Sequence, residues 1–263
     1  MSLPPLLGRR ILVTRAAHQA GKLSEGLRAL GAEPVEVPVL EIHPPASFAP
    51  LDAALRQFAS YDWLILTSAN AVQKLVERAA ALGISVSQLA WLKVAAVGES
   101  TAAEARTAGF KVAFVPQAYV AESLVDGLMQ TLQNKLSGKR ILLARAAVAR
   151  DVIPEALRAA GAAVDVVDAY QNIMPKAAPE QLRSAVRSGI DAVTFTSSSS
   201  ATHLAEAARA ANVEWPVAMV PAVSIGPVTS KTLRELGWQP AAEAGPSDIP
   251  GLIAAVVHVL RGA

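Results

Sequence analysis

The sequence predicts an α/β protein with two doubly wound parallel-sheet domains, joined by a two-stranded linker and derived from an internal duplication. Its length of 263 residues suits two domains of ordinary size. Apolar residues make up 52% of the chain and aromatic residues only 5%, so the cores must consist mainly of small aliphatic side chains. The same motifs also recur in the same order in the two parts of the chain.

The first repeated element is a short apolar run followed by a polar turn. Residues 9–17 read RRILVTRAA, and residues 139–147 read KRILLARAA. Each run continues into an amphipathic stretch that ends in LRALGA at 27–32 or in LRAAGA at 157–162. This pattern is typical of a buried parallel strand, its turn, and a crossover helix closed by glycine.

Two further elements repeat in the same order. The run YDWLILTSAN at 61–70 is matched by IDAVTFTSS at 190–198, and VAAVGEST at 94–101 is matched by VSIGPVT at 223–229. Strands and helices therefore alternate, which predicts parallel sheets with right-handed crossovers. Helices are expected to begin near His18, Asn70, Ser100, Val120, Arg150, Ser199 and Val228.

Two extended, proline-terminated segments occupy equivalent places in the repeats and are the expected linkers. They are VPVLEIHPP at 37–45 and VDAYQNIMP at 167–175. If the chain crosses between domains at each linker, residues 1–38 and 174–263 form one discontinuous domain and residues 40–170 form the other. A two-stranded hinge of this kind would let a cleft between the domains open and close.

The composition argues against several classes of protein. The chain has no cysteine and four dispersed histidines, so no disulfide, metal site or metal cofactor is expected. A net charge of +2 without a basic run argues against nucleic-acid binding. No apolar stretch reaches the roughly 18–20 residues that span a bilayer. Because no signal segment is recognisable either, a cytoplasmic location is expected.

Common catalytic motifs are also absent. Neither G-x-G-x-x-G nor G-x-x-x-x-G-K-[ST] occurs, which argues against dinucleotide-binding dehydrogenases and P-loop enzymes. There is no G-x-S-x-G either, and His203, which follows a run of serines, is expected to be a surface or packing residue.

Polar turns follow the predicted strands, and ligands of parallel sheets bind at that edge. Helix N-termini there offer unpaired N–H groups to carboxylates or phosphates. Helix capping alone explains any single serine or threonine, whereas six such turns favour a site. Arg15 and Arg145 are placed to pair with a carboxylate, with a salt bridge across the cleft as the alternative. The turns are 14–15, 67–70, 98–101, 145, 196–199 and 226–229.

Taken together, these motifs resemble the uroporphyrinogen-III synthase family over essentially the whole chain. The resemblance rests on VTR ending at Arg15, LTSANAV around Ser68, VGxxTA around Thr101, VVDAY ending at Tyr170, FTSS around Ser197 and IGPxT ending at Thr229. Ala16 departs from the proline that many members have after the arginine.

The resemblance implies two α/β domains with a two-stranded linker and no metal or organic cofactor. It also implies a lyase of tetrapyrrole and haem biosynthesis that acts on hydroxymethylbilane, a linear tetrapyrrole with eight carboxylates. Loss of the ring A hydroxyl leaves an azafulvenium cation, which ring D attacks through its substituted carbon to form a spirocyclic pyrrolenine. This intermediate opens and recloses as uroporphyrinogen III, with ring D inverted and water lost. The unguided reaction gives the type I isomer, so the protein must chiefly impose geometry.

Residue by residue, the resemblance implies that Tyr170 assists departure of the hydroxyl as a hydrogen-bond donor. A buried linker anchor is the alternative role of Tyr170, since a buried phenol needs a partner in either case. The resemblance also implies that Thr101 and Thr229 lie in the cleft and that Ser68, Asn70, Ser197 and Ser198 belong to turns that hold the substrate carboxylates. The two arginines and the two turn glycines complete the expected set of substrate-binding residues, namely Arg15, Arg145, Gly98 and Gly226.

Two other classes of protein stay open at this point. A two-domain closing-cleft binding protein without catalysis would share the architecture, although an exported binder should carry a signal segment. A response-receiver-like module would need an aspartate at a strand end, where this chain has Thr, Ser and Gly. The expected partners are the small-molecule polycarboxylate and, transiently, hydroxymethylbilane synthase, and a monomer is expected.

Overall fold

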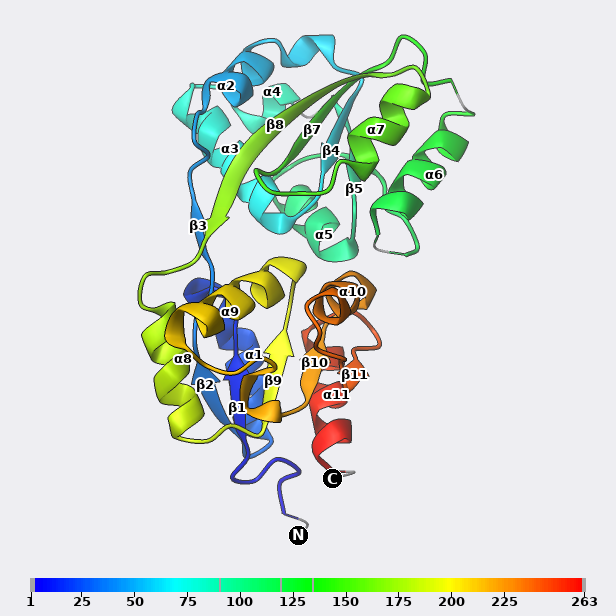
Figure 1. Cartoon of the computed structure of the whole chain (residues 1–263). Helices are drawn as coiled ribbons and strands as arrows, with labels where there is room; N and C mark the ends of the chain where they lie inside the picture. The colour runs from blue at the N-terminus through cyan, green and yellow to red at the C-terminus, as the bar shows by residue number, and fades with distance from the viewer. Residues whose placement is uncertain (1–2, 90, 119, 134, 262–263) are drawn as a thin grey trace. The chain divides into compact units, whose positions relative to one another are not determined.

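The computed structural model describes residues 3–89, 91–118, 120–133 and 135–261 (Figure 1). The chain divides into two compact units, and unit 2 is continuous from His43 to Asn172. Unit 1 combines the segment up to Ile42 with the segment from Ile173 onward. Parallel sheets with helices on both faces form each unit, so the α/β fold class predicted from the sequence is confirmed.

Unit 1 holds a five-stranded sheet in the order β11-β10-β9-β1-β2. Neighbouring strands in this sheet run parallel. The elements are β1 (Arg10–Val13), α1 (Ala17–Ala29), β2 (Glu33–Glu36), α8 (Ala178–Arg187), β9 (Ala192–Phe195), α9 (Ser198–Ala211), a 3-10 turn η2 (Val217–Met219), β10 (Ala222–Ser224), α10 (Pro227–Glu235), β11 (Ala242–Glu243) and α11 (Ile249–Arg261).

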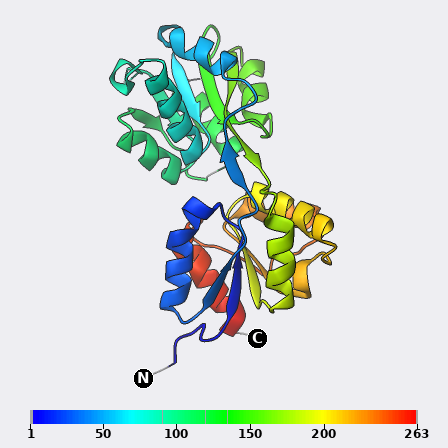
Figure 2. The same ribbon diagram turned by 90° about the vertical axis from the view of Figure 1, so that its left-hand side faces the viewer.

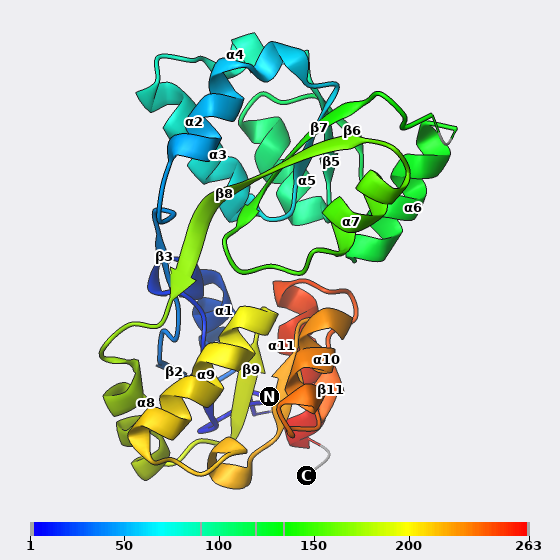
Figure 3. The same ribbon diagram turned by 45° about the horizontal axis from the view of Figure 1, so that its top comes forward.

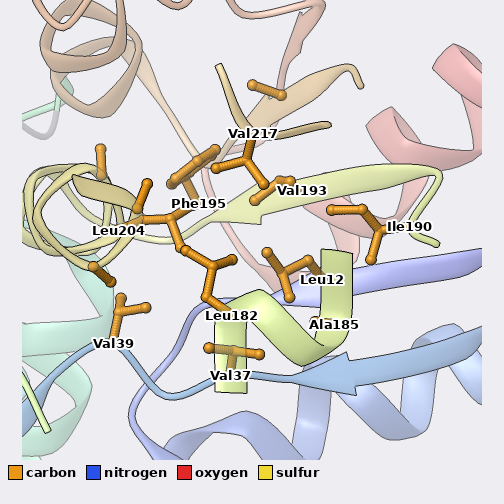
Figure 4. Close-up of a cluster of buried hydrophobic side chains, with 14 of the residues drawn as sticks. Leu12, Val37, Val39, Leu182, Ala185, Ile190, Val193, Phe195, Leu204 and Val217 are labelled. Atoms are coloured by element: carbon orange, nitrogen blue, oxygen red, sulfur yellow. The ribbon is translucent and has the colours of Figure 1, made fainter. Parts of the chain in front are cut away.

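Two hydrophobic clusters cover the two faces of this sheet. Leu12, Val193 and Phe195 point to the face on which Leu182 of α8 and Leu204 of α9 pack (Figure 4). The alternate strand residues belong to a second cluster, formed with α1 and α11. Helices α8, α9 and α10 lie side by side over the first face (Figure 3). Residues of both clusters alternate along β1, as expected for a strand that is buried on both sides.

Unit 2 holds most of a six-stranded sheet in the order β3-β8-β7-β4-β5-β6. Its outermost strand, β3 (Glu41–His43), runs across the boundary between the two units and lies next to β8. The other elements are α2 (Ala49–Arg56), a 3-10 turn η1 (Phe58–Ser60), β4 (Trp63–Leu66), α3 (Ala69–Ala81), α4 (Val86–Leu89), β5 (Lys93–Ala96), α5 (Glu99–Thr107), β6 (Val112–Phe114), α6 (Ala121–Thr131), β7 (Arg140–Ala146), α7 (Val152–Ala159) and β8 (Ala163–Ile173).

The sheet of unit 2 is also covered on both faces. Helices α6 and α7 pack with Ile65, Ile141 and Leu143 on one face. Helix α3 buries its apolar side against β4 and β7 on the other face, and Figure 2 shows the helices on the two sides in cyan and in green. Each predicted helix start lies within two residues of an observed one. The two expected linkers contain β3 and the second half of β8, both of which are extended.

Candidate active site

The polar turns predicted from the sequence follow strands that are neighbours in their sheets. In unit 2 these strands are β7, β4 and β5, and in unit 1 they are β1, β9 and β10. Since parallel strands present their carboxyl ends at the same edge, each unit gathers its turns at one sheet edge. Arg145 is a partial exception, because β7 continues through Ala146 and therefore includes it.

Tyr170 lies near the end of β8 and is 5% exposed. Its hydroxyl is 3.1 Å from Oγ of Ser68, at the turn after β4. Ser68 is also the N-cap of α3, where its Oγ accepts a hydrogen bond of 3.1 Å from the N–H of Ala71. The predicted catalytic tyrosine and one predicted binding serine are therefore in direct contact.

The turns after β5 and β10 are built alike. Gly98 and Gly226 are the N-caps of α5 and α10, and neither can cap its helix with a side chain. At the third position of each helix stands a threonine, Thr101 or Thr229, that is 4% exposed. Within the described part of the chain, neither hydroxyl makes a hydrogen bond. Each turn thus pairs the positive end of a helix with an available hydroxyl, an arrangement that suits a carboxylate.

Gly226 has a steric role as well. A Cβ atom at this position would lie 2.9 Å from Oγ of Ser247, which is closer than ordinary van der Waals contact. The backbone of the Gly226 turn therefore approaches the segment before α11, and any larger residue would displace Ser247 or the turn.

The two predicted arginines differ in their partners. Arg15 is partly buried, and burial lowers the pKa of its guanidinium. No ion pair or hydrogen bond links it to another described residue. Arg145 instead donates to the carbonyl of Arg150 at 3.0 Å and to Oδ1 of Asp151 at 2.7 Å. Of the two, Arg15 alone is free of partners in the described chain, so it is the better candidate for binding an anion.

The turn after β9 is closed by its own hydrogen bonds. Oγ of Ser197 accepts the N–H of Ser200 at 3.1 Å, and Oγ of Ser200 accepts the N–H of Ser197 at 3.3 Å. Ser198 donates to the carbonyl of Val228 at 3.3 Å and accepts from Thr232 at 2.9 Å. The bonds between Ser197 and Ser200 match the capping role that was the alternative expectation for single serines, whereas those of Ser198 join α9 to α10.

Asn70 and His203 complete the set of residues that the sequence raised as candidates for chemistry, and both lie on helices. Asn70 is in the first turn of α3, two residues after Ser68. His203 is on α9, and its Nδ1 is buried without a hydrogen-bond partner among the described residues. No acidic or basic side chain of the described residues forms a hydrogen bond with Tyr170, whose hydrogen-bond partner is the neutral hydroxyl of Ser68.

The described residues contain no group of three or more His, Cys, Asp or Glu side chains placed to hold a metal ion. None of their helices is long and apolar enough to cross a membrane.

The partners of two site residues were not predicted from the sequence. Nothing in the spacing of Ser68 and Tyr170 indicates that their hydroxyls meet, because β7 separates β8, which holds Tyr170, from β4, which Ser68 follows. The pairing of Arg145 with Asp151 had a usable signal, because an acidic residue six positions on, across a short turn, is within reach of the arginine.

Comparison with known proteins gives consistent results over the whole chain. The family described as uroporphyrinogen-III synthase HemD matches residues 21–254. A uroporphyrinogen-III synthase from Synechococcus elongatus is 38% identical over 99% of both chains. One from Escherichia coli is 28% identical, over 94% of this chain and 99% of its own.

Solved structures agree on the fold. A mutant uroporphyrinogen III synthase from Thermus thermophilus matches with a TM-score of 0.69 and 21% identity, over 97% of this chain and 100% of its own. A uroporphyrinogen-III synthetase from Helicobacter pylori matches with a TM-score of 0.63 and 20% identity, over 95% and 99% of the two chains. At these identities the likeness supports the two-unit α/β architecture.

Proposed function

This chain belongs to the uroporphyrinogen-III synthase family, and we propose that it is a lyase that cyclises hydroxymethylbilane to uroporphyrinogen III in haem and tetrapyrrole biosynthesis. The observation that carries the proposal is the 38% identity to the Synechococcus enzyme along 99% of both chains. Because the alignment covers 99% of both chains, the helices and strands of this fold have counterparts in that relative. The comparisons give no support to a closing-cleft binding protein without catalysis.

Tyr170 is the proposed catalytic residue. Its phenol would donate a hydrogen bond to the ring A hydroxyl as the carbon–oxygen bond breaks. The leaving oxygen would take a proton from solvent and depart as water, and the proton released on ring closure restores the balance. A donor aimed at developing negative charge stabilises the transition state more than the ground state. Its burial and its contact with Ser68 support this role, because both restrict where the phenol can point.

The steps after water departs need geometry more than acid or base strength. Ring D attacks the cation through its substituted carbon, the bond from that carbon to its old methylene neighbour breaks, and closure at the free position completes the ring with loss of a proton. Holding a flexible tetrapyrrole so that the substituted carbon reacts is an orientation effect. The abundance of neutral donors at the two sheet edges fits such a task.

The substrate carboxylates would be bound at the carboxyl edge of each sheet. In unit 2 the proposed binding residues are Ser68, Asn70, Gly98, Thr101 and Arg145. In unit 1 they are Arg15, Ser197, Ser198, Gly226 and Thr229. Among these, the unpaired Arg15 and the available hydroxyls of Thr101 and Thr229 have the strongest support, since binding an anion there breaks no contact between described residues.

The same proposal includes the domain boundaries, the oligomeric state, the cellular location and the transient partner of the enzyme. Units 1 and 2 would be folding domains with the boundaries expected from the sequence, namely 1–38 with 174–263, and 40–170. The compactness of each unit supports this division. The enzyme would be a cytoplasmic monomer that meets hydroxymethylbilane synthase transiently, because that enzyme supplies its unstable substrate.

Product analysis tests the proposed function directly. Purified protein treated with a chelator should convert hydroxymethylbilane mainly to the type III isomer, as separated by chromatography after oxidation. A reaction without protein, run in parallel, gives the type I background. A product mixture equal to that background, or a requirement for a metal or nucleotide, would contradict the proposal.

A further inference from the structure

An irregularity in the pairing of β7 and β8 decides which face of the sheet Tyr170 occupies. Residues pair in strict register from Arg140 with Ala163 to Arg145 with Asp168, and then Ala146 pairs with Tyr170. Ala169 is therefore an extra residue in β8. Such a bulge reverses the alternation of side chains beyond it and often redirects a side chain near an active site.

The consequence for Tyr170 follows from the two faces of the sheet. Val164 and Val166 belong to the cluster formed with α6 and α7, and strict alternation would place residue 170 on that same side. Pairing with Ala146 places it on the opposite side, which α3 covers. The bulge thus brings the phenol to the N-terminus of α3, where Ser68 lies 3.1 Å away.

The hydrogen-bonding capacity of Ser68 restricts the direction of this contact. A serine hydroxyl has one donor hydrogen and two acceptor lone pairs. One lone pair of Ser68 accepts the N–H of Ala71, which is one of the unpaired donors at the start of α3. Accepting that N–H strengthens the serine as a donor, because hydrogen bonds in a chain polarise one another. The O–H of Ser68 is then well suited to donate to the oxygen of Tyr170.

We propose that Ser68 is a positioning residue, which donates its hydrogen to the phenol oxygen of Tyr170 and so leaves the phenol hydrogen available for the departing hydroxyl. This inference rests on the proposed function and assigns Ser68 a role other than direct binding of a substrate carboxylate. Because a phenol oxygen that accepts a hydrogen bond is a better donor through its own O–H, Ser68 would act on the breaking bond through Tyr170.

A purely structural role for Ser68 makes different predictions. If Ser68 only caps α3, its loss should lower thermal stability and should not depend on the presence of the phenol. If it binds a carboxylate directly, its loss should chiefly raise KM. A positioning role should instead lower kcat, leave KM nearly unchanged and require Tyr170.

A set of variants separates these roles. Ser68→Ala should lower kcat for type III formation about tenfold, with KM within about twofold of wild type. Ser68→Thr keeps a hydroxyl and should restore most of kcat. Ser68→Gly removes the hydroxyl but remains a tolerated N-cap, so it should lose kcat like Ser68→Ala with a smaller change in melting temperature.

The decisive measurement is a double-mutant cycle with Tyr170→Phe. In that background, Ser68→Ala should change kcat by less than about twofold, since the group through which it acts is gone. Ser60→Ala is the matched control, because Ser60 is a hydroxyl of the same unit that accepts from Arg140 and donates to the carbonyl of Gln57. Its kcat should equal that of wild type.

Two results overturn the proposal, and both are distinct from failure of the proposed function. Equal losses of kcat on removing Ser68 with and without the phenol, or an effect confined to KM, would exclude a positioning role while the wild-type chain still forms type III. A wild-type chain that forms only type I would instead contradict the proposed function and, with it, the role of Tyr170.

Discussion

At the amino edge of each sheet, an aspartate accepts two hydrogen bonds from the start of the first strand of the repeat. One comes from a basic side chain and the other from the backbone N–H of the next residue. Asp62 accepts from Nζ of Lys139 at 2.7 Å and from the N–H of Arg140 at 2.9 Å. Asp191 accepts from Nη1 of Arg9 at 3.0 Å and from the N–H of Arg10 at 2.7 Å. At this edge both repeats use the same pair of aspartate contacts to hold two neighbouring strands together.

The carboxyl edges of the same sheets have diverged. Ser68 and Ser197 are equivalent N-caps, and each accepts a backbone N–H at 3.1 Å. The backbone N–H of Ser197 donates to Oγ of Ser200, which closes that turn on itself, whereas Oγ of Ser68 also meets the hydroxyl of Tyr170. The duplicated turns have therefore kept the capping that the backbone requires and changed what else their hydroxyls contact.

The two arginines also differ between the repeats, but here it is the residue of unit 2 that is held by its own turn. Arg145 of unit 2 is held by Asp151 and the carbonyl of Arg150, while Arg15 of unit 1 lacks a partner among the described residues. Unit 2 thus presents a positioned phenol, and unit 1 presents an unpaired cation. Differences between the repeats at this edge indicate function, whereas the retained amino edges indicate stability.

The sharpest test of this contrast compares two buried tyrosines of unit 2. Tyr170→Phe at the carboxyl edge should lower kcat for type III formation by more than about a hundredfold, because the lost donor acts where charge develops. Tyr61→Phe at the amino edge removes a 2.7 Å hydrogen bond to Asp165 and should change stability instead. Steady-state rates and melting temperatures of both variants are the measurements. Full activity of Tyr170→Phe would remove the proposed catalytic role.

The second test compares the two arginines. Arg15→Met should raise KM about tenfold to a hundredfold, which is the usual effect of losing a hydrogen bond to a charged group, and should not lower the melting temperature. Arg145→Met should lower stability by about 1 kcal/mol, because the carbonyl of Arg150 and Asp151 lose their partner. Rates at several substrate concentrations and thermal unfolding distinguish the two. Equal KM effects would show that local pairing does not determine which arginine binds substrate.

A smaller and symmetrical effect is expected for the threonines. Thr101→Val and Thr229→Val remove the available hydroxyls with little change of shape, and each should lower kcat/KM about tenfold. Neither should lower the free energy of unfolding, since no hydrogen bond between described residues is lost. A tenfold loss in one variant and none in the other would show that the equivalent turns have diverged here too.

The smallest expected effect is the response of stability to acid. Hydrogen bonds from Arg78 lower the pKa of Asp52, and those from Tyr61 and Arg140 lower the pKa of Asp165. Burial opposes ionisation of Asp62, but its bonds with Lys139 and Arg140 outweigh burial and lower its pKa. Carboxyl groups with lowered pKa values contribute stability above their unfolded pKa, and that stability is lost as the pH falls through the folded pKa.

All three of these carboxyl groups lie in unit 2, so acid should weaken unit 2 as the pH falls below about 4. Brief digestion with pepsin at a series of pH values below that point, with the cuts mapped by mass spectrometry, should show early cleavage between His43 and Asn172. Asp165→Asn should shift that cleavage to higher pH. Earlier cleavage in unit 1 would contradict the assignment.

The sequence was sufficient to predict the fold class, because the repeated apolar runs report burial on both faces of parallel strands. It also placed the polar turns at strand ends, since local patterning determines where each strand stops. The contact of Ser68 with Tyr170 could not be predicted, because it depends on the extra residue Ala169 in β8, which has no local signature. A strictly alternating strand would have put Tyr170 on the wrong face.

The difference between the two arginines had one local signal in the sequence. Arg15 and Arg145 occupy the same repeat position, but Asp151 lies six residues after Arg145, whereas Gly21 stands at the equivalent place after Arg15. The difference arises because β7 extends to Ala146, which brings the turn with Asp151 back to Arg145, whereas β1 ends at Val13. Strand length, set by pairing with β8, is a tertiary property.

The discontinuous path of unit 1 has a consequence for how the chain is made. Strand β1 lies between β2 and β9 in the sheet, and β9 emerges from the ribosome about 180 residues after β1. Unit 2 is continuous and can complete its sheet in the meantime, apart from the linker strand β3 that pairs with the late part of β8. The nascent N-terminal strand pair therefore waits with an inner edge whose backbone groups are unpaired, and such an edge is a template for pairing with other chains during synthesis.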